Sequence, residues 1–363
     1  MAGIGDTLIA TPLLRELRQS LPRSRIDVLV FWKGSKDLLA HNPNVDRIVQ
    51  KNILSDDPQT LLRFFNELRR EHYDISLNTH PQGRVEYRCV ARAVGASLRV
   101  SHEYDHFSWW DRLLVNRTLP QDYGIHSVEN NLRLLDLLDI RRTIEKPELE
   151  LFLQAEERVW AANFVADHAI NNQRCIGIHV GSGTTKNLRF KRWPLHNYAS
   201  LVSRLVNRYQ ETPILLFGGP EEFSDNQLIA NLAGGSKVWI PRTPSVRHAA
   251  ALLEHCSVFL SVDNLMMHLA ASVHVPTQIV IESPTFGPTV APYRSSFTLV
   301  PNPITHGRGL EFYRYHGGDI SGGPEFLIRC MNSITVDAVE QVINSAVEKS
   351  APTLETGSTK PSS

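Results

Sequence analysis

The chain has 363 residues, which is too long for one ordinary hydrophobic core and predicts two domains. Lysine and arginine together number 38, as do aspartate and glutamate, so a formal net charge of zero leaves no general basic field that would hold nucleic acid. The four cysteines are far apart and form no CxxC pair, which argues against zinc and against a disulfide framework and favours a reducing, cytoplasmic compartment.

Short apolar strands alternate with amphipathic helices along the first half of the sequence. Leucines at positions 8, 13, 14 and 17 recur at helical spacing and predict a helix over 7–19. The stretch 101–125 is irregular and rich in His, Trp and Asp, so it is equally typical of a binding loop and of a loop that packs its aromatic side chains. The other elements expected in this half are strands at 26–31, 47–50, 75–77 and 98–100 and helices at 58–71, 84–93 and 126–139.

A charged segment at 141–151 interrupts the periodicity and marks a domain boundary. Beyond it the alternation resumes, which implies two parallel-sheet domains that face each other, 1–150 and 151–333, with ligands at the carboxyl ends of the strands. A helix is expected over 334–349, and the Ser-, Thr- and Pro-rich tail 350–363 is expected to be disordered. The elements expected between 151 and 333 are helices at 155–169, 195–209, 221–232, 245–254 and 264–272 and strands at 175–180, 213–217, 237–240, 258–262 and 277–281.

The segment Gly3-Ile4-Gly5-Asp6 leads directly into the first helix. Glycines let a backbone approach a ligand closely, and the N-terminus of a helix attracts negative charge. Asp6 lies at this junction and is therefore a candidate site residue. An aspartate that only caps the helix has the same pattern, and from this segment alone it is the favoured interpretation.

A second group of polar residues follows the predicted strand 175–180. Its first part supplies N–H groups and hydroxyls on which a phosphate can rest, although such a run is more often a turn. Lys191 and Arg192 come next, and two cations beside a glycine-rich loop either neutralise a pyrophosphate or form a solvated basic loop. The residues of the first part are Gly181, Ser182, Gly183, Thr184 and Thr185.

Two later strand ends also carry polar side chains. Glu221 and Glu222 follow strand 213–217, where a carboxylate can accept from ribose hydroxyls or favour the positive end of the next helix. Asp263 and Asn264 follow strand 258–262, with Asp263 expected as the cap of a helix whose N–H groups would face a diphosphate. His268 lies about one turn inside that helix, a position where histidine is more often structural than catalytic.

Five segments, taken in order, carry a pattern beyond any single motif. They are GIGDTLIATPLLRELRQSLP, GSGTTKNLRFKRWPLHNYASLVSRL, LLFGGPEE, SVDNLMMHLAASVHVPT and CMNSITVDAVEQV. In content and spacing these segments resemble the heptosyltransferase family, glycosyltransferase family 9, over roughly residues 3–345.

The resemblance implies the GT-B architecture: two Rossmann-like, doubly wound α/β domains face each other across a cleft, and the last helix crosses back to the first domain. The N-terminal domain would take the acceptor and the C-terminal domain the donor. Family members transfer heptose from ADP-heptose, with inversion, to the inner core of bacterial lipopolysaccharide. By position, Asp6 matches the proposed catalytic base. The donor contacts by position are Thr184, Thr185 and Lys191 for the phosphates, Glu221 or Glu222 for the ribose, and Asp263 and His268 at the phosphate-binding helix start.

The chain departs from the family pattern in three places. The pattern has a strand ahead of Gly3, so the resemblance implies that this strand is missing or that the start lies upstream. Leu265 replaces a glycine that lets the backbone approach the diphosphate. The segment 282–285 reads Glu-Ser-Pro-Thr where Phe-Gly-Pro-Thr is usual, so both replacements bear on donor affinity.

We therefore expect a glycosyltransferase in which Asp6 accepts the acceptor proton while cations and helix N–H groups stabilise the departing diphosphate. The expected partners are a nucleotide-sugar donor and a glycolipid or glycan acceptor. No cofactor or metal is expected, because the carboxylates form no DxD site. No apolar run approaches the roughly 20 residues of a membrane span. Peripheral contact with the inner membrane face is left open, and two alternatives stay open as well: a catalytically weak nucleotide-sugar-binding relative, and a nucleotide-sugar epimerase.

Overall fold

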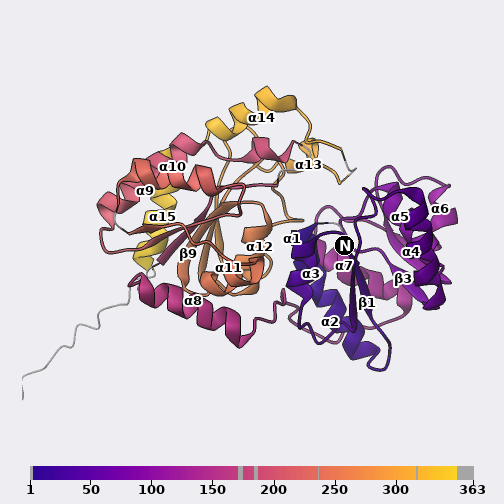
Figure 1. The fold of residues 1–363 in the computed structure, drawn as a ribbon. Coiled ribbons are helices and arrows are strands. Elements are labelled where there is room, and N and C mark those ends of the chain that lie inside the picture. The colour runs from indigo at the N-terminus through magenta and orange to yellow at the C-terminus, as the bar shows by residue number, and fades with distance from the viewer. Residues whose placement is uncertain (1–2, 171–174, 184–186, 236, 316–317, 350–363) are drawn as a thin grey trace, which may run out of the picture.

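The computed structural model describes residues 3–170, 175–183, 187–235, 237–315 and 318–349, which form two α/β halves lying side by side (Figure 1). The tail 350–363 and the candidate residues Thr184 and Thr185 lie outside the described residues. None of the described helices is long and apolar enough to cross a membrane.

The N-terminal half has its parallel strands in two separate sheets. One sheet pairs β1 (Asp27–Val30) with β2 (Arg47–Gln50), and the other has the order β3 (Ile75–Leu77), β4 (Leu98–Glu103) and β5 (Arg117–Pro120). Within residues 3–150 no pairing joins β1 to β3. The helices of this half are α1 (Ile4–Ile9), α2 (Thr11–Ser20), α3 (Lys33–Leu39), α4 (Pro58–Arg70), α5 (Val85–Val94), α6 (Asp111–Leu114), α7 (Ser127–Arg133) and the 3₁₀ helix η1 (Leu134–Leu138).

The C-terminal half is built on one parallel sheet of six strands. Their order is β11 (Phe297–Val300), β10 (Thr277–Ile281), β9 (Cys256–Val262), β6 (Cys175–His179), β7 (Ile214–Phe217) and β8 (Val238–Trp239). The order reverses between β6 and β9, and ligands of such sheets bind at the carboxyl ends of the strands at this point. The helices are α8 (Ala155–Asp167), η2 (Leu188–Lys191), α9 (Leu195–Arg208), α10 (Phe223–Ala233), α11 (Val246–Leu253), α12 (Leu265–Ser272), α13 (Gly309–Phe312), α14 (Gly323–Asn332) and α15 (Val336–Lys349).

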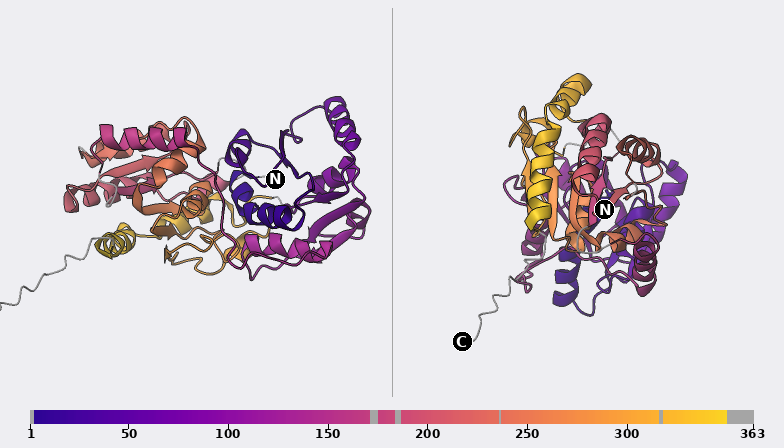
Figure 2. Two further views of the ribbon diagram at one scale, coloured as in Figure 1. Left: turned by 90° about the horizontal axis from the view of Figure 1, so that it is seen from below. Right: turned by 90° about the vertical axis from the view of Figure 1, so that its left-hand side faces the viewer.

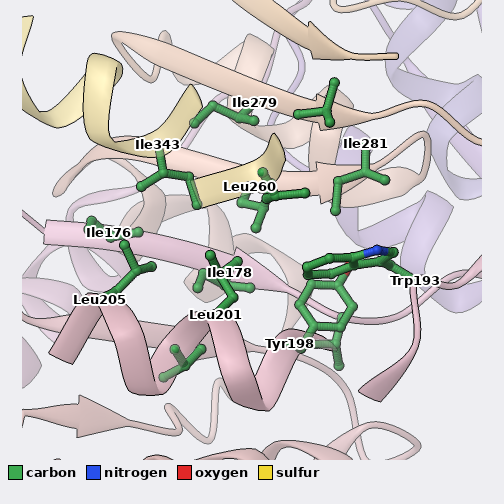
Figure 3. Close-up of a cluster of buried hydrophobic side chains, with 14 of the residues drawn as sticks. Ile176, Ile178, Trp193, Tyr198, Leu201, Leu205, Leu260, Ile279, Ile281 and Ile343 are labelled. Atoms are coloured by element: carbon green, nitrogen blue, oxygen red, sulfur yellow. The ribbon is translucent and has the colours of Figure 1, made fainter. Parts of the chain in front are cut away.

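The main core lies between this sheet and helices α9 and α15. Every residue of β6 and β9 is buried, because helices cover both faces of a parallel sheet. Ile178 and Leu260 of the sheet face Leu201 of α9, and Ile343 of α15 joins them (Figure 3). Trp193 is fully buried in the same cluster and donates from Nε1 to the carbonyl oxygen of Ile334 at 2.9 Å. This bond fixes the segment that follows Lys191 and Arg192 to the core.

The last helix does not cross back to the N-terminal half, contrary to the expectation. α15 packs against α9 and against strands β9, β10 and β11, on the side of the molecule away from the N-terminal half (Figures 1 and 2). Its apolar stripe of Val339, Ile343 and Ala346 is already buried in the C-terminal core, which accounts for its place there.

Several predicted elements differ from the structure. The single helix over 7–19 is two helices, and Pro12 lies in the first turn of the second, where its missing N–H costs nothing. The helix over 126–139 continues from Arg133 only as η1 and ends where Asp139 adopts a left-handed φ of 55°. The stretch 101–125 contains the end of β4, α6 and β5 rather than one irregular loop. The elements that the sequence analysis missed are α3, α6, β5, η2, β11, α13 and α14.

The two halves share buried contacts. Leu8 of α1 and Leu38 of α3 belong to one apolar cluster with Phe259, Leu253 and Leu269 of the C-terminal half. The clustered contacts link α1 and α3 to α11 and α12, so the start of the chain is held against the C-terminal half.

A buried ion pair reinforces this junction. Arg247 of α11 donates from Nη2 to Glu157 Oε2 at 3.1 Å and from Nη1 to the carbonyl oxygen of Ala40 at 3.1 Å. We expect Arg247→Met to lower the free energy of unfolding by about 3–5 kcal/mol, because it leaves the Glu157 carboxylate buried without its partner. Urea denaturation checks this, with the exposed Arg242→Met as the control. Equal midpoints for the two variants would contradict the prediction.

Candidate functional site

The candidate site lies where the carboxyl ends of β6 and β9 meet the start of α1. Helices α1 and α12 are adjacent at the junction of the two halves (Figure 1). A Cβ built at Gly5 would lie 3.2 Å from His268 Cδ2 and 3.7 Å from the Cα of Leu265. The start of α1, which carries Asp6, therefore touches the start of α12, which carries the donor-side candidates.

On the donor side, Lys191 and Asp263 form a buried ion pair. Lys191 Nζ donates to Asp263 Oδ2 at 2.9 Å and to the Asp263 carbonyl oxygen at 2.6 Å, with both residues 7% exposed. Thr285 Oγ1 donates to Asp263 Oδ2 at 2.8 Å, and Ser283 Oγ donates to Asp263 Oδ1. A buried charge pair persists only when such additional hydrogen bonds satisfy it. The lysine is thus fixed in place at the carboxyl ends of the strands.

The residue that caps α12 is Asn264 and not Asp263, because Asp263 is engaged with Lys191. Asn264 Oδ1 accepts from the N–H groups of Met266 at 2.8 Å and Met267 at 3.3 Å. Its Nδ2 donates to the carbonyl oxygen of Gly181 at 2.9 Å, which ties α12 to the end of β6. The side chain of Asn264 therefore fixes the position of the loop that begins at Gly181 relative to the N-terminus of α12.

Two buried histidines line this region in the neutral form. Burial lowers the pKa of His179 to about 3, so its Nδ1 accepts from Asn264 Nδ2 at 3.0 Å. Burial, with the nearby His126 as a smaller cause, also lowers the pKa of His268 to about 3. Within the described part of the chain His268 Nδ1 has no hydrogen-bond partner. This neutral imidazole packs against Gly5, the residue before Asp6.

Of the two adjacent glutamates, Glu222 is the buried one, and it bonds to Arg192 of the candidate site. Arg192 Nη2 donates to Glu222 Oε1 at 3.0 Å, and the Gly219 N–H donates to Glu222 Oε2 at 3.0 Å. Burial raises the pKa of Glu222, whereas Glu221 is exposed to solvent. A Cβ at Gly181 would collide with the Glu222 carboxyl group, which explains the glycine at that position.

Arg192 also anchors the loop that begins at Gly181. Its Nη2 donates to the Ser182 carbonyl oxygen at 3.3 Å, and Ser182 Oγ donates to the Leu188 carbonyl oxygen at 2.8 Å. Gly183, the last described residue before the gap, is exposed. Arg192 is therefore committed to the loop and to Glu222, which makes Lys191 and Arg192 unequal in role.

Asp6 occupies the third position of α1, and Gly3 is the cap residue. The Gly3 N–H donates to Asp6 Oδ2 at 2.9 Å, the reach-back contact of a capping box. The negative charge of Asp6 also acts beyond its own helix. Burial, followed by Asp6, raises the pKa of Tyr87 in the N-terminal half and of Tyr313 in the C-terminal half, each to about 12. The carboxylate thus faces side chains from both halves.

Leu265 packs against the apolar core at the junction of the two halves. Its side chain is partly buried against the apolar cluster that contains Leu8, and Ile4 packs on the same cluster. The leucine that replaces the family glycine is thereby part of the apolar contact between α1 and α12. Similarly, the hydroxyl of Ser283 bonds to Asp263, and Glu282 accepts from the N–H groups of Asn302 at 2.8 Å and Gly307 at 2.8 Å.

The sequence analysis missed a segment of the C-terminal half that reaches the N-terminal half. Tyr315 lies edge-on to the ring of His80 at 4.9 Å between centroids, and its hydroxyl is 2.6 Å from Thr289 Oγ1. Arg314 Nε forms an ion pair with Asp105 at 2.8 Å. The signal in the sequence is the group Tyr-Arg-Tyr at 313–315, which none of the five family-like segments covers. These aromatic residues line the Asp6 end of the site.

On the donor side each of the two cations, Lys191 and Arg192, is paired with a buried carboxylate. Among the described residues no group of three or more His, Cys, Asp or Glu side chains is arranged to hold a metal ion. Chemically, the arrangement offers a carboxylate on α1 and, on the side of the adjoining α12, a fixed ammonium group and a helix N-terminus, which suits a hydroxyl nucleophile and an anionic leaving group.

Comparison with known proteins gives matches along most of the chain. The model of glycosyltransferase family 9 (heptosyltransferase) matches residues 61–307. Lipopolysaccharide heptosyltransferase 3 of Escherichia coli is 25% identical over 287 residues, which cover 75% of this chain and 78% of the relative.

Two solved structures have the same fold over nearly the whole length. The family 9 glycosyl transferase of Veillonella parvula has a TM-score of 0.75 at 18% identity, covering 96% of both chains. The Escherichia coli ADP-heptose lipopolysaccharide heptosyltransferase II has a TM-score of 0.69 at 19% identity, covering 96% of this chain and 97% of the other. The GT-B fold expected from the sequence is confirmed.

Proposed function

Because the chain belongs to glycosyltransferase family 9, the heptosyltransferases, we propose that it transfers a heptose from ADP-heptose to a hydroxyl of a lipopolysaccharide-core acceptor, with inversion at the anomeric carbon. The observation that carries the proposal is the contact between the starts of α1 and α12, with Gly5 against His268. Since Asp6 follows Gly5 in α1, this contact supports a site in which Asp6 acts together with the helix N-terminus and the ion pair proposed to bind the donor. The names of the relatives in Escherichia coli support ADP-heptose and lipopolysaccharide as substrates.

In the proposed mechanism Asp6 is the general base. The acceptor hydroxyl is a poor nucleophile, and the carboxylate accepts its proton as the oxygen attacks the anomeric carbon. The Asp6 contact with the Gly3 N–H holds the side chain in one orientation, and the carboxylate charge raises the pKa of a tyrosine in each half. This orientation favours a carboxylate that receives a proton at the junction rather than in bulk solvent.

The departing ADP is stabilised by groups that are already in place. Negative charge grows on the diphosphate as the glycosidic bond breaks, and preorganised donors stabilise such charge without reorganising. Lys191 and the N–H groups at the start of α12 are the candidates, and Glu222 is the proposed ribose contact. In this proposal the lysine and the helix end serve the diphosphate, so turnover needs no metal ion.

Ligand binding and product analysis test the proposal. At a concentration of about 100 times its Kd, ADP-heptose should raise the free energy of unfolding by about 2.7 kcal/mol, because it binds only the folded chain. UDP- and GDP-sugars serve as controls and should stabilise the chain less. With ADP-heptose and a lipopolysaccharide-core acceptor lacking the transferred heptose, mass spectrometry should find the acceptor extended by one heptose.

Other outcomes would point elsewhere. Stabilisation by ADP-heptose without any extended acceptor would favour the catalytically weak binding relative. Stabilisation by another nucleotide sugar, with transfer of that sugar, would keep the mechanism and replace the donor. A change in the donor sugar in the absence of acceptor would contradict transfer altogether.

A further inference from the structure

An exposed aromatic patch lies at the outer end of the N-terminal half. Trp109 and Trp110 are 64% and 61% exposed, and their rings are stacked with centroids 3.6 Å apart. Leu113, 59% exposed, and the exposed Arg112 follow on α6. These four residues are called the tryptophan patch. Soluble proteins rarely expose a contiguous apolar patch of this kind unless the patch serves an interaction.

Buried hydrogen bonds on the inner side of α6 hold the tryptophan patch in place. Arg88 of α5 donates from Nε to Asp111 Oδ1 at 2.5 Å, and both residues are buried. The Ser108 N–H donates to Asp111 Oδ2 at 2.7 Å and so fixes the turn that precedes the tryptophans. A buried ion pair is costly to form and stabilises only when well bonded. The fold therefore holds these indoles outward instead of leaving them on a loose loop.

The helices around the tryptophan patch are basic. Helices α4, α5 and α6 carry six arginines against three acidic residues, a net charge of +3, whereas the whole chain has a formal net charge of 0. Arg63 and Arg92 are exposed, and neither forms an ion pair with any described residue. The three helices lie next to one another at the end of the molecule away from the C-terminal half (Figure 1). An anionic partner would complement this surface.

We infer that the tryptophan patch docks the N-terminal half onto an anionic lipid bilayer. Tryptophan favours the bilayer interface, where its amphipathic ring lies at the level of the headgroups with its N–H hydrogen-bonded there. Binding of an interfacial segment grows with its buried apolar area and with attraction of its basic residues to anionic lipid. Indoles and leucine together with unpaired arginines supply both contributions, a combination suited to lipid phosphates rather than to a hydrocarbon interior or a neutral protein surface.

A series of contacts connects the tryptophan patch to the Asp6 end of the site. Arg88 Nη1 donates to the Gly83 carbonyl oxygen at 3.0 Å, and a Cβ at Gly83 would collide with Tyr315, which lines that end of the site. Docking would therefore hold the acceptor side of the molecule at the bilayer surface, where a lipid-linked acceptor presents its sugars. This last step rests on the proposed function, whereas lipid binding itself does not.

Vesicle flotation without donor or acceptor tests the inference. The full chain is mixed with vesicles of phosphatidylcholine alone or of phosphatidylcholine with phosphatidylglycerol. We expect binding to the anionic vesicles, a blue shift of tryptophan fluorescence, and weakening by salt. The variant Trp109→Ala/Trp110→Ala should bind at least about tenfold more weakly, because the interfacial aromatic contact is lost. Arg63→Gln/Arg92→Gln should weaken binding about tenfold on anionic vesicles only.

A matched control separates this patch from general hydrophobicity. Leu228→Ala/Leu232→Ala removes two exposed apolar side chains from α10 of the C-terminal half and should leave vesicle binding unchanged. Equal binding by the parent and the tryptophan variant would overturn the inference, as would equal loss in the leucine variant. So would an oligomer, seen by analytical ultracentrifugation, that depends on the tryptophans while vesicle binding does not.

Transfer assays distinguish this inference from the proposed function. The tryptophan variant should keep parental turnover on a soluble, delipidated core acceptor and lose it selectively on acceptor embedded in anionic vesicles. If the parent transfers no heptose but binds vesicles through the tryptophans, the proposed function fails and the docking surface stands. If transfer is normal and independent of the tryptophans on both acceptors and binding is unchanged, the docking surface fails alone.

Discussion

Replacing Asp6 by asparagine should reduce turnover at least about a hundredfold, because an amide cannot accept the acceptor proton. This substitution removes the proton acceptor and keeps the hydrogen bond that holds the start of α1. Asparagine Oδ1 can still accept from the Gly3 N–H that Asp6 Oδ2 now binds at 2.9 Å, so the start of α1 keeps its reach-back contact. The expected result is therefore loss of chemistry with little loss of structure, measured as single-turnover formation of the extended acceptor.

Nucleotide binding provides the first control for Asp6→Asn. ADP affinity, measured by calorimetry, should change by less than about threefold, since removal of a group that acts only in the transition state leaves ground-state binding intact. A second control is Asp57→Asn at the start of α4, where Asp57 accepts from the N–H groups of Gln59 and Thr60. That variant alters a helix cap without touching the junction of the halves, and it should turn over at the parental rate. If Asp6→Asn also turned over at the parental rate, Asp6 would act only as a helix cap and not as the general base.

The fold was predictable where periodicity is strong. Strands β6, β9 and β10 are short apolar runs, and helices α9 and α15 have regular apolar stripes, so pattern alone located them within a few residues. Elements that depend on tertiary contact were missed. α6 has only four residues and is held by the Arg88–Asp111 pair, a contact between positions 23 apart that no local pattern indicates.

The donor side of the site was only partly predictable. Lys191 and Asp263 follow two different predicted strands whose carboxyl ends were expected at one edge of the sheet. From the sequence we assigned the lysine to a diphosphate and the aspartate to a helix cap. The structure joins the two in one ion pair and gives the cap to Asn264. A choice between neighbouring residues of similar capping propensity is decided by which one has a buried partner, and that partner is 72 residues away in the sequence.

The Asp6 side was predictable only through family resemblance. A GIGD segment before a helix is typical of a ligand site but favours a helix cap when taken alone, and the structure contains the capping contact. What the segment cannot indicate is that Gly5 lies against His268 and that Tyr313 and Tyr315 approach from the other half. These residues come from segments hundreds of positions apart, so their meeting is a property of how the two halves dock.

The second large effect is expected at Lys191. Lys191→Met leaves the Asp263 carboxylate buried with Ser283 and Thr285 as its remaining side-chain donors among the described residues, so the free energy of unfolding should fall by about 3–5 kcal/mol. Turnover should fall about 10²–10³-fold as well, because the proposed diphosphate loses its fixed positive charge. Loss of activity in this variant alone would not separate the two roles of the lysine.

The double variant Lys191→Met/Asp263→Asn separates them. Without a carboxylate at 263 no unpaired charge is buried. The asparagine Oδ1 can still accept from one of the Ser283 and Thr285 hydroxyls, and its Nδ2 can donate to the oxygen of the other, so most of the lost stability should return. Turnover and ADP affinity should stay low, because the ammonium group is still absent. Urea denaturation and ADP calorimetry on the parent, the single variant and the double variant measure both quantities. If affinity and turnover returned together with stability, the lysine would serve Asp263 and not the diphosphate, and the charge that balances the leaving group would have to come from the N-terminus of α12.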